Sequence, residues 1–161
     1  MKKLFGLSIV AGVILACNQG QQPAAGANDT TQASTIRKDT LPGPQQVAGC
    51  YTAVSGRDTA GLRLEERDSN LNGALSYNYY EKDRNEGSFQ GEVHDGMLTG
   101  WYLFRSEGVM SVRQVAWQIR GSELWPAIGE MEQRNDTMLF RDLSKLRFDS
   151  VLVFRKVPCV L

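Results

Sequence analysis

Aromatic and charged side chains recur at alternate positions in two segments of the chain. One segment carries Tyr77, Tyr79 and Glu81, and the other carries Arg113 and Trp117, four residues apart. Side chains two residues apart on a β-strand point to the same face, so each segment would present its set to one side of a sheet. Aromatic rings offer apolar walls, and their O–H and N–H groups can orient a bound molecule. With Tyr51 as a further wall residue, the candidate ligand-binding residues are Tyr77, Tyr79, Glu81, Tyr102, Arg113 and Trp117.

Glu81 and Arg113 carry opposite charges at the ends of these alternating segments. If the alternation persists, both side chains point inward at the rim of the sheet. They would then pair with each other or with Glu107, or bind a charged molecule. The sequence favours an ion pair that fixes strand register. Breaking such a pair when it is buried costs roughly 3 to 5 kcal/mol.

Catalytic and metal chemistry find little support. His94 is the one histidine of the chain, and it stands beside Asp95-Gly96, a pair that predicts a hairpin tip. No nucleophile pattern surrounds it. Metal sites need several suitable ligands at fixed spacing, and the sequence offers no such cluster. We therefore expect no enzyme activity, no catalytic residue, no metal and no cofactor.

Period-two alternation of apolar and polar residues dominates the chain from Gly49 onward, and no segment shows a sustained helical stripe. Turn signals separate the alternating segments, with Asp95-Gly96 the clearest of them. The predicted strands cover residues 62–65, 71–79, 89–93, 97–105, 114–120, 128–133, 137–141 and 150–157.

These strands predict an all-β fold, an antiparallel meander that closes into a small lipocalin-like barrel of about eight strands. Closure removes the exposed edges that invite pairing with other chains. A two-sheet β-sandwich built from the same strands is the alternative. A barrel of this size has just enough interior to be filled by side chains or to hold one small molecule, and the sequence leaves both open.

The N-terminus carries a short apolar segment of a different kind. Two lysines precede a run from Leu4 to Leu15 that is too short to span a bilayer. The run ends in Ile14-Leu15-Ala16-Cys17, which resembles the bacterial lipobox. That resemblance implies that residues 1–16 are a signal peptide and that diacylglyceryl and acyl chains on Cys17 anchor the protein to a membrane. An ordinary signal peptide cut elsewhere is the alternative.

Residues 17–47 are rich in Gln, Ala, Gly, Thr, Asn and Pro, so they predict a flexible linker before a domain at 48–161. Removing residues 1–16 takes two lysines from 18 basic residues, which leaves 16 against 18 acidic ones and a formal charge of about −2. This charge gives no reason to expect a nucleic-acid partner. The residues just after Cys17 carry no acid, which favours an outer-membrane location facing the periplasm.

Cys50 and Cys159 remain once Cys17 is set aside as the lipid site. In an oxidising compartment two such cysteines pair by default, so we predict a disulfide, with two unpaired buried thiols as the alternative. Closing a loop of about 110 residues would stabilise the fold by about 4.7 kcal/mol in the chain-entropy model. The bridge also predicts that the first and last strands are neighbours.

Several motifs in the folded part occur together in one group of proteins. They are Gly49-Cys50-Tyr51, Tyr80-Glu81-Lys82-Asp83-Arg84-Asn85-Glu86-Gly87, Ser106-Glu107-Gly108 and Lys156-Val157-Pro158-Cys159. With them the domain resembles, over nearly its whole length, a family of uncharacterised small bacterial envelope lipoproteins. The resemblance implies no activity.

The sequence therefore leaves two kinds of partner open. We expect a non-enzymatic binding module for a small ligand in the cell envelope. The alternative is an accessory factor or inhibitor of an envelope enzyme, which would bind protein through the charged loops 82–87 and 105–108.

Overall fold

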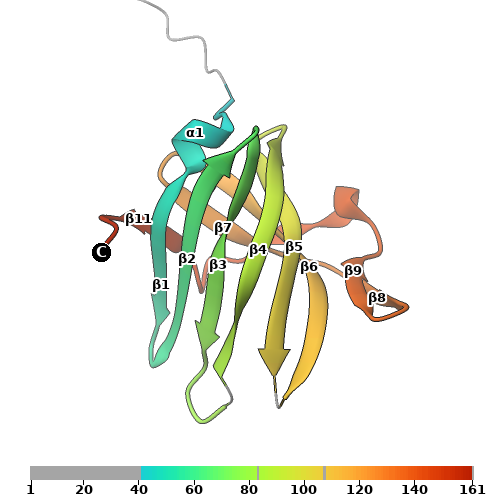
Figure 1. The fold of residues 1–161 in the computed structure, drawn as a ribbon. Helices are drawn as coiled ribbons and strands as arrows, with labels where there is room; N and C mark the ends of the chain where they lie inside the picture. The colour runs from blue at the N-terminus through green and yellow to red at the C-terminus, as the bar shows by residue number, and fades with distance from the viewer. Residues whose placement is uncertain (1–40, 83, 107, 161) are drawn as a thin grey trace, which may run out of the picture. The chain divides into compact units, whose positions relative to one another are not determined.

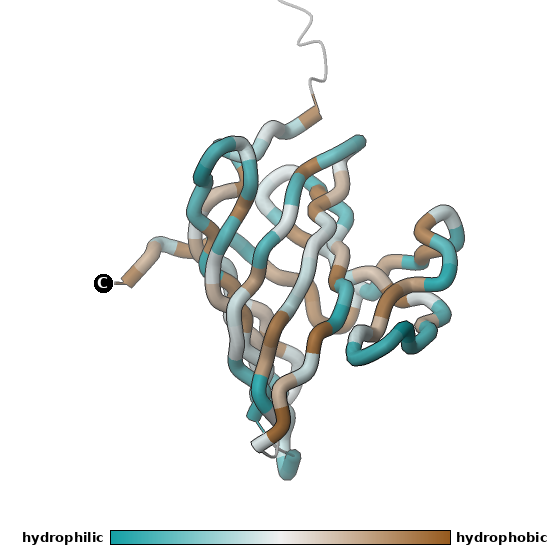
Figure 2. The backbone as a smooth tube through the Cα atoms, turned by 45° about the vertical axis from the view of Figure 1, so that its right-hand side comes forward, coloured by the Kyte–Doolittle hydropathy of each residue, from teal (hydrophilic) through white to brown (hydrophobic). Residues whose placement is uncertain are grey.

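The alternating segments form antiparallel strands in the computed structural model, which describes residues 41–82, 84–106 and 108–160 (Figure 1). The signal peptide, Cys17 and the linker up to residue 40 lie outside the described residues. Along the strands, hydrophobic and hydrophilic residues follow one another as the period-two pattern requires (Figure 2). The strands of the barrel are β1 (Gly49–Ser55), β2 (Asp58–Arg67), β3 (Asn70–Asn78), β4 (Arg84–His94), β5 (Met97–Ser106), β6 (Val109–Arg120), β7 (Glu123–Ile128) and β11 (Phe154–Val157).

These eight strands close into an antiparallel barrel. Strands β1 to β7 pair in sequence order, and β11 pairs with both β7 and β1, which completes the ring. The predicted closed barrel is therefore confirmed, and the two-sheet sandwich is wrong. Since every strand of the ring has two neighbours, the barrel has no free edge along its circumference.

The chain leaves the ring between β7 and β11. It forms a hairpin of β8 (Met131–Arg134) and β9 (Thr137–Phe140), the short 3₁₀ helix η1 (Leu143–Lys145) and β10 (Arg147–Phe148). Strand β9 pairs in parallel with β6, and β10 pairs with β7. The β8–β9 hairpin therefore lies beside the barrel rather than within the ring (Figure 1).

Two predicted strand boundaries are wrong in this region. The segment 128–133 is interrupted at Gly129 and Glu130, and its two ends belong to β7 and β8. Strands β1 and β7 are absent from the predicted set; β7 contains Pro126, which cannot donate a ladder hydrogen bond. The last segment is shorter than predicted, because residues 150–153 form bends and only Phe154–Val157 is a strand.

The predicted hairpin at Asp95-Gly96 is confirmed. His94 and Met97 are paired across it, so the loop has two residues. Both loop residues have positive φ, 49° at Asp95 and 73° at Gly96. This is the backbone of a type I′ turn, whose twist matches that of the strands it joins.

Inward-facing glycines allow β4 and β5 to coil tightly. Gly91 and Gly100 are paired in register, and the ring of Phe89 packs against both. A Cβ added at Gly100 would lie 2.3 Å from the Gln90 carbonyl oxygen and 2.7 Å from the Phe89 ring. Only glycine fits such a close approach, which lets the sheet curve into a barrel.

The short helix α1 (Pro44–Val47) lies over one end of the barrel and leads directly into β1 (Figure 1). Val47 is buried, and the hydroxyl of Tyr51 donates a hydrogen bond to its carbonyl oxygen at 2.6 Å. Lys156 Nζ donates to the Gln46 carbonyl oxygen at 2.8 Å. The folded body thus begins at residue 44 rather than 48, and the end of the predicted linker is part of the core.

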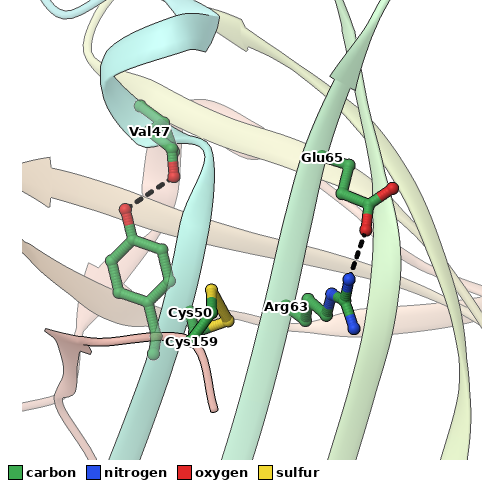
Figure 3. The surroundings of a disulfide bond; sticks show 6 residues. Val47, Cys50, Arg63, Glu65 and Cys159 are labelled. Carbon is green, nitrogen blue, oxygen red and sulfur yellow. Dashed lines mark hydrogen bonds and ion pairs between the residues drawn. A yellow bond between two sulfur atoms is a disulfide. The ribbon is translucent and has the colours of Figure 1, made fainter. Parts of the chain in front are cut away.

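The predicted disulfide is confirmed. Cys50 at the start of β1 is bonded to Cys159, just after β11, with 5.2 Å between the two Cα atoms (Figure 3). Strands β1 and β11 are direct neighbours, with Cys50 paired to Val157. The bridge therefore fastens the two ends of the domain at the point where the barrel closes. In the described part of the chain, no helix is long and apolar enough to cross a bilayer.

Candidate functional site

A cavity of about 300 Å³ lies in the barrel, lined by β3 to β7 and by parts of the excursion between β7 and β11. Five of the six candidate ligand-binding residues line it: Tyr77, Tyr79, Tyr102, Arg113 and Trp117. They lie close together because the register pairs neighbouring strands at these positions, with Tyr77 opposite Asn85 and Tyr102 opposite Arg113. The sequence therefore identified five of the eighteen described residues that line this cavity, and their role in binding stays a prediction.

The cavity lies towards the end of the barrel away from α1. Tyr77 stands near the end of β3, Asn85 near the start of β4 and Phe104 near the end of β5. These strand ends are joined by the β3–β4 and β5–β6 turns, which lie opposite α1 in Figure 1. The barrel interior is thus packed towards α1, where Leu71 and Leu98 are fully buried, and hollow towards the other end.

The wall of the cavity is a chain of aromatic contacts. The rings of Tyr77 and Tyr79 are stacked with centroids 5.7 Å apart, and Tyr77 meets Tyr102 edge to face at 6.1 Å. Tyr102 in turn stacks on Phe104 at 4.7 Å. Such pairs fix the ring positions beyond what area burial alone provides. The wall is therefore rigid and largely apolar.

Three buried polar atoms at the cavity have no hydrogen-bond partner among the described residues. They are Asn85 Oδ1, the Tyr102 hydroxyl and Trp117 Nε1, and all three residues line the cavity. Buried polar groups are almost always hydrogen-bonded, and each one left without a partner costs about 1 to 3 kcal/mol. Together they offer an acceptor, a hydroxyl that can donate or accept, and an N–H donor.

Burial keeps the tyrosines of this wall neutral. It raises the pKa of Tyr102 to about 12, with the negative charge of Glu86 adding to the rise. Burial likewise raises the pKa of Tyr77 and Tyr79 above the ordinary value. The guanidinium of Arg113 opposes the pKa rise at all three hydroxyls. Near neutral pH these hydroxyls therefore carry their protons and can act as donors.

Arg113 lies on the inward face of β6 in phase with Trp117, as predicted, and its side chain is solvent-exposed where it lines the cavity. Its Cζ atom is 6.0 Å from the centre of the Phe104 ring. No carboxylate of the described residues lies within ion-pair distance of it. Glu107, a predicted alternative partner, lies outside the described residues.

The predicted position of Glu81 is wrong. Strand β3 ends at Asn78, and Glu81 stands in the following turn with a φ of 56° and an exposed side chain. The alternation that would have carried it inward stops before it, because the chain turns towards β4. Glu81 therefore does not line the cavity and forms no ion pair with Arg113. Tyr51 is also elsewhere, since it packs beneath α1.

The sequence analysis missed several lining residues. Asn85 and Phe104 follow from strand alternation once the strands are extended to their true ends. Gln114 and Asp149 do not, because the fold of the excursion decides their place. Both are already engaged: Gln114 Oε1 accepts from the Phe140 backbone N–H, and Asp149 Oδ1 accepts from that of Val151.

Two other places are weaker candidates. A more open hollow beside the disulfide is bounded by Cys50, Arg63 and Val160, and none of the three unpartnered polar atoms belongs to it. His94 is highly exposed and lies 3.0 Å from the Asp95 carboxylate at the β4–β5 turn. Within residues 41–82, 84–106 and 108–160, no cluster of His, Cys, Asp and Glu is suited to a metal ion.

Comparison of the chain with protein-family models, with curated proteins and with solved structures gave no match. The geometry of the cavity and the residues around it therefore carry the functional argument.

Proposed function

We propose that this protein is a membrane-anchored bacterial lipoprotein whose barrel binds a small ligand in the cavity lined by Tyr102 and Arg113. The cavity volume of about 300 Å³ is at the lower end of the range of small-molecule sites. Its lining is more apolar than polar and combines aromatic and aliphatic side chains with polar groups, as is common in such sites.

The observation that carries the proposal is the set of buried polar atoms without partners. Asn85 Oδ1, the Tyr102 hydroxyl and Trp117 Nε1 are all buried, and their residues line one cavity. These atoms are closed to solvent, so a ligand would reach them through small shifts of the lining side chains; the hydrogen bonds formed would offset their desolvation cost and favour a matching molecule.

Binding rather than catalysis is favoured by the titratable groups of the lining. The tyrosines hold their protons to high pH, and Asp149 is engaged by a backbone N–H. Arg113 cannot act as a base near neutral pH. The tyrosines and Arg113 therefore provide no general base or activated nucleophile near neutral pH.

A location in the bacterial envelope is supported by the lipobox-like segment before Cys17 and by the disulfide. Bonds of this kind persist in oxidising compartments such as the periplasm. We propose a lipid anchor at Cys17 in the outer membrane, with the domain facing the periplasm.

The experiment is native mass spectrometry of the full-length protein purified in mild detergent from its own host. We expect an additional mass of a small molecule, beyond the protein and its acyl chains. The matched variants are Val115→Phe and Ile128→Trp, which fill the cavity from two strands, and Val112→Phe, which adds the same volume as the first variant on β6 outside the lining.

The additional mass should be lost in both cavity variants and kept in Val112→Phe. Ile128 is partly exposed, so its replacement is expected to fold even if the one at Val115 does not. Absence of any bound molecule in the wild-type protein, or equal retention in all three variants, contradicts the proposal. A co-purifying protein in place of a small molecule would favour the accessory-factor alternative.

A further inference from the structure

We propose that the ligand is a small amphipathic anion, with its carboxylate against Arg113 and its apolar body along the aromatic wall. This inference rests on the proposed function and assigns the chemical class of the molecule that the cavity takes.

The charge of the site comes from Arg113. Its guanidinium carries five N–H donors in a planar fork that suits a carboxylate. No carboxylate of the described residues lies within ion-pair distance of it. Arg113 is directly opposite Tyr102 in the β5–β6 register. The positive charge therefore stands beside the tyrosine wall.

The acids around this wall are already engaged. Glu86, whose negative charge raises the pKa of Tyr102, forms an ion pair with Arg84 at 3.0 Å. Asp58, whose negative charge raises the pKa of Tyr79, accepts a hydrogen bond from the Tyr80 backbone N–H at 2.8 Å.

Asp149 is the one carboxylate among the described lining residues, and it comes from the excursion between β7 and β11. Its Oδ1 atom accepts from the Val151 N–H at 2.8 Å, and its backbone N–H is bonded to the Pro126 carbonyl oxygen. Arg113 is therefore the charged lining residue beside the tyrosines in the described part of the chain, and a negatively charged head group is the one that can pair with it.

The hydroxyls of the wall reinforce this preference. Tyr77, Tyr79 and Tyr102 stay protonated near neutral pH, and the Tyr102 hydroxyl has no partner among the described residues. Protonated hydroxyls and a guanidinium are all donors, and a carboxylate is an acceptor with room for several of them. A cationic head group beside the tyrosines would be repelled by the charge of Arg113.

The apolar body of the ligand is matched by the stacked rings and by Val115, Pro126 and Leu152. The volume of about 300 Å³ equals roughly ten water molecules at about 30 Å³ each, which suits an acid with one or two rings. Trp117, which also lines the cavity, carries a further buried donor, Nε1.

The test is isothermal titration calorimetry of the full-length protein near neutral pH with three probes of one shape. They are 2-naphthylacetate, 2-naphthaleneethanol and 2-(2-naphthyl)ethylamine, which are an anion, a neutral alcohol and a cation. We expect the acid to bind about tenfold or more tightly than the alcohol, as a charge-assisted pair allows, and the amine to bind most weakly.

The variants are Arg113→Gln, Arg113→Lys and the matched control Arg105→Gln, which removes an exposed charge of β5 that does not line the cavity. Arg113→Gln should abolish the preference for the acid while the alcohol keeps its affinity within about twofold. Arg113→Lys should keep part of the preference, because it retains the charge and loses the fork. Arg105→Gln should behave as wild type.

Several outcomes overturn the inference: equal affinity of acid and alcohol, tighter binding of the amine, no binding by any probe, or equal losses in Arg113→Gln and Arg105→Gln. In each case the mass-spectrometric result decides separately whether the proposed function stands. A retained molecule that carries no negative charge would leave ligand binding in place and would refute its assigned chemistry.

Discussion

Removing the hydroxyl of Tyr102 should stabilise the unliganded protein, whereas the same change at Tyr51 should destabilise it. Both side chains are buried, with exposed fractions of 2% for Tyr102 and 5% for Tyr51. The Tyr102 hydroxyl has no partner in the described part of the chain, but that of Tyr51 donates to the Val47 carbonyl oxygen at 2.6 Å. The substitutions Tyr102→Phe and Tyr51→Phe therefore delete the same atom, in one case without a hydrogen-bond partner and in the other with one.

The magnitudes follow from the cost of burying a polar group. A buried hydroxyl without a partner costs about 1 to 3 kcal/mol, so Tyr102→Phe should raise the free energy of unfolding by about 1 kcal/mol. Tyr51→Phe loses a hydrogen bond and leaves the Val47 carbonyl unpaired, which should lower the free energy of unfolding by about 1 to 2 kcal/mol. For a domain of this size, 1 kcal/mol corresponds to about 3 to 5 °C in Tm.

The assay is thermal and urea unfolding of the ligand-free full-length protein, followed by circular dichroism with the disulfide oxidised. The urea m-value must stay unchanged, so that each shift of the midpoint reports stability. A loss of 1 kcal/mol or more in Tyr102→Phe, or shifts of the same sign in both variants, would refute the reasoning. The Tyr102 hydroxyl would then have a partner, and the cavity would offer one polar group fewer to a ligand.

Three further predictions concern the fold. The double variant Cys50→Ser/Cys159→Ser should lose about 4 to 5 kcal/mol in urea unfolding, since the bridge closes a separation of 109 residues, and an unchanged midpoint would contradict this. The contribution of Tyr51 and Tyr102 to stability should be constant below about pH 9 and fall as the pH rises from 10 towards 12, because both keep, in the folded state, protons that the unfolded chain loses; a pH titration by circular dichroism that shows no alkaline decline would oppose it. Gly100→Ala should lower Tm by several degrees, because its added Cβ clashes with Phe89. The control Gly43→Ala, whose Cβ meets open space, should change Tm little. Equal shifts of Tm in calorimetry would count against the role given to Gly100.

Strand alternation predicted the faces of the barrel but not the ends of its strands. Alternation alone predicts the inner face for Tyr77 and Trp117, because a period of two needs no knowledge of the partner strand. Glu81 was placed there by the same rule and does not belong, since β3 stops at Asn78. Whether a strand continues depends on the pairing available beyond it, which lies elsewhere in the chain.

The same limit explains the unpredicted part of the cavity. Strand β7 contains Pro126, and a local rule counts that residue against a central strand. Its pairing with β6 and β11 overrides the rule, because the ladder closes around it. The place of Asp149 depends in turn on how the excursion after β7 folds back.

By itself, the sequence determined the all-β class, the inward faces of the main strands and the disulfide between Cys50 and Cys159, because side-chain alternation and cysteine number are local properties. Only the tertiary structure decided that the ring closes through β7 and β11, that α1 packs one end, and that the other end stays hollow. Closure and volume depend on how side chains from many strands fill a shared space. That balance left the polar atoms of Asn85, Tyr102 and Trp117 buried without partners.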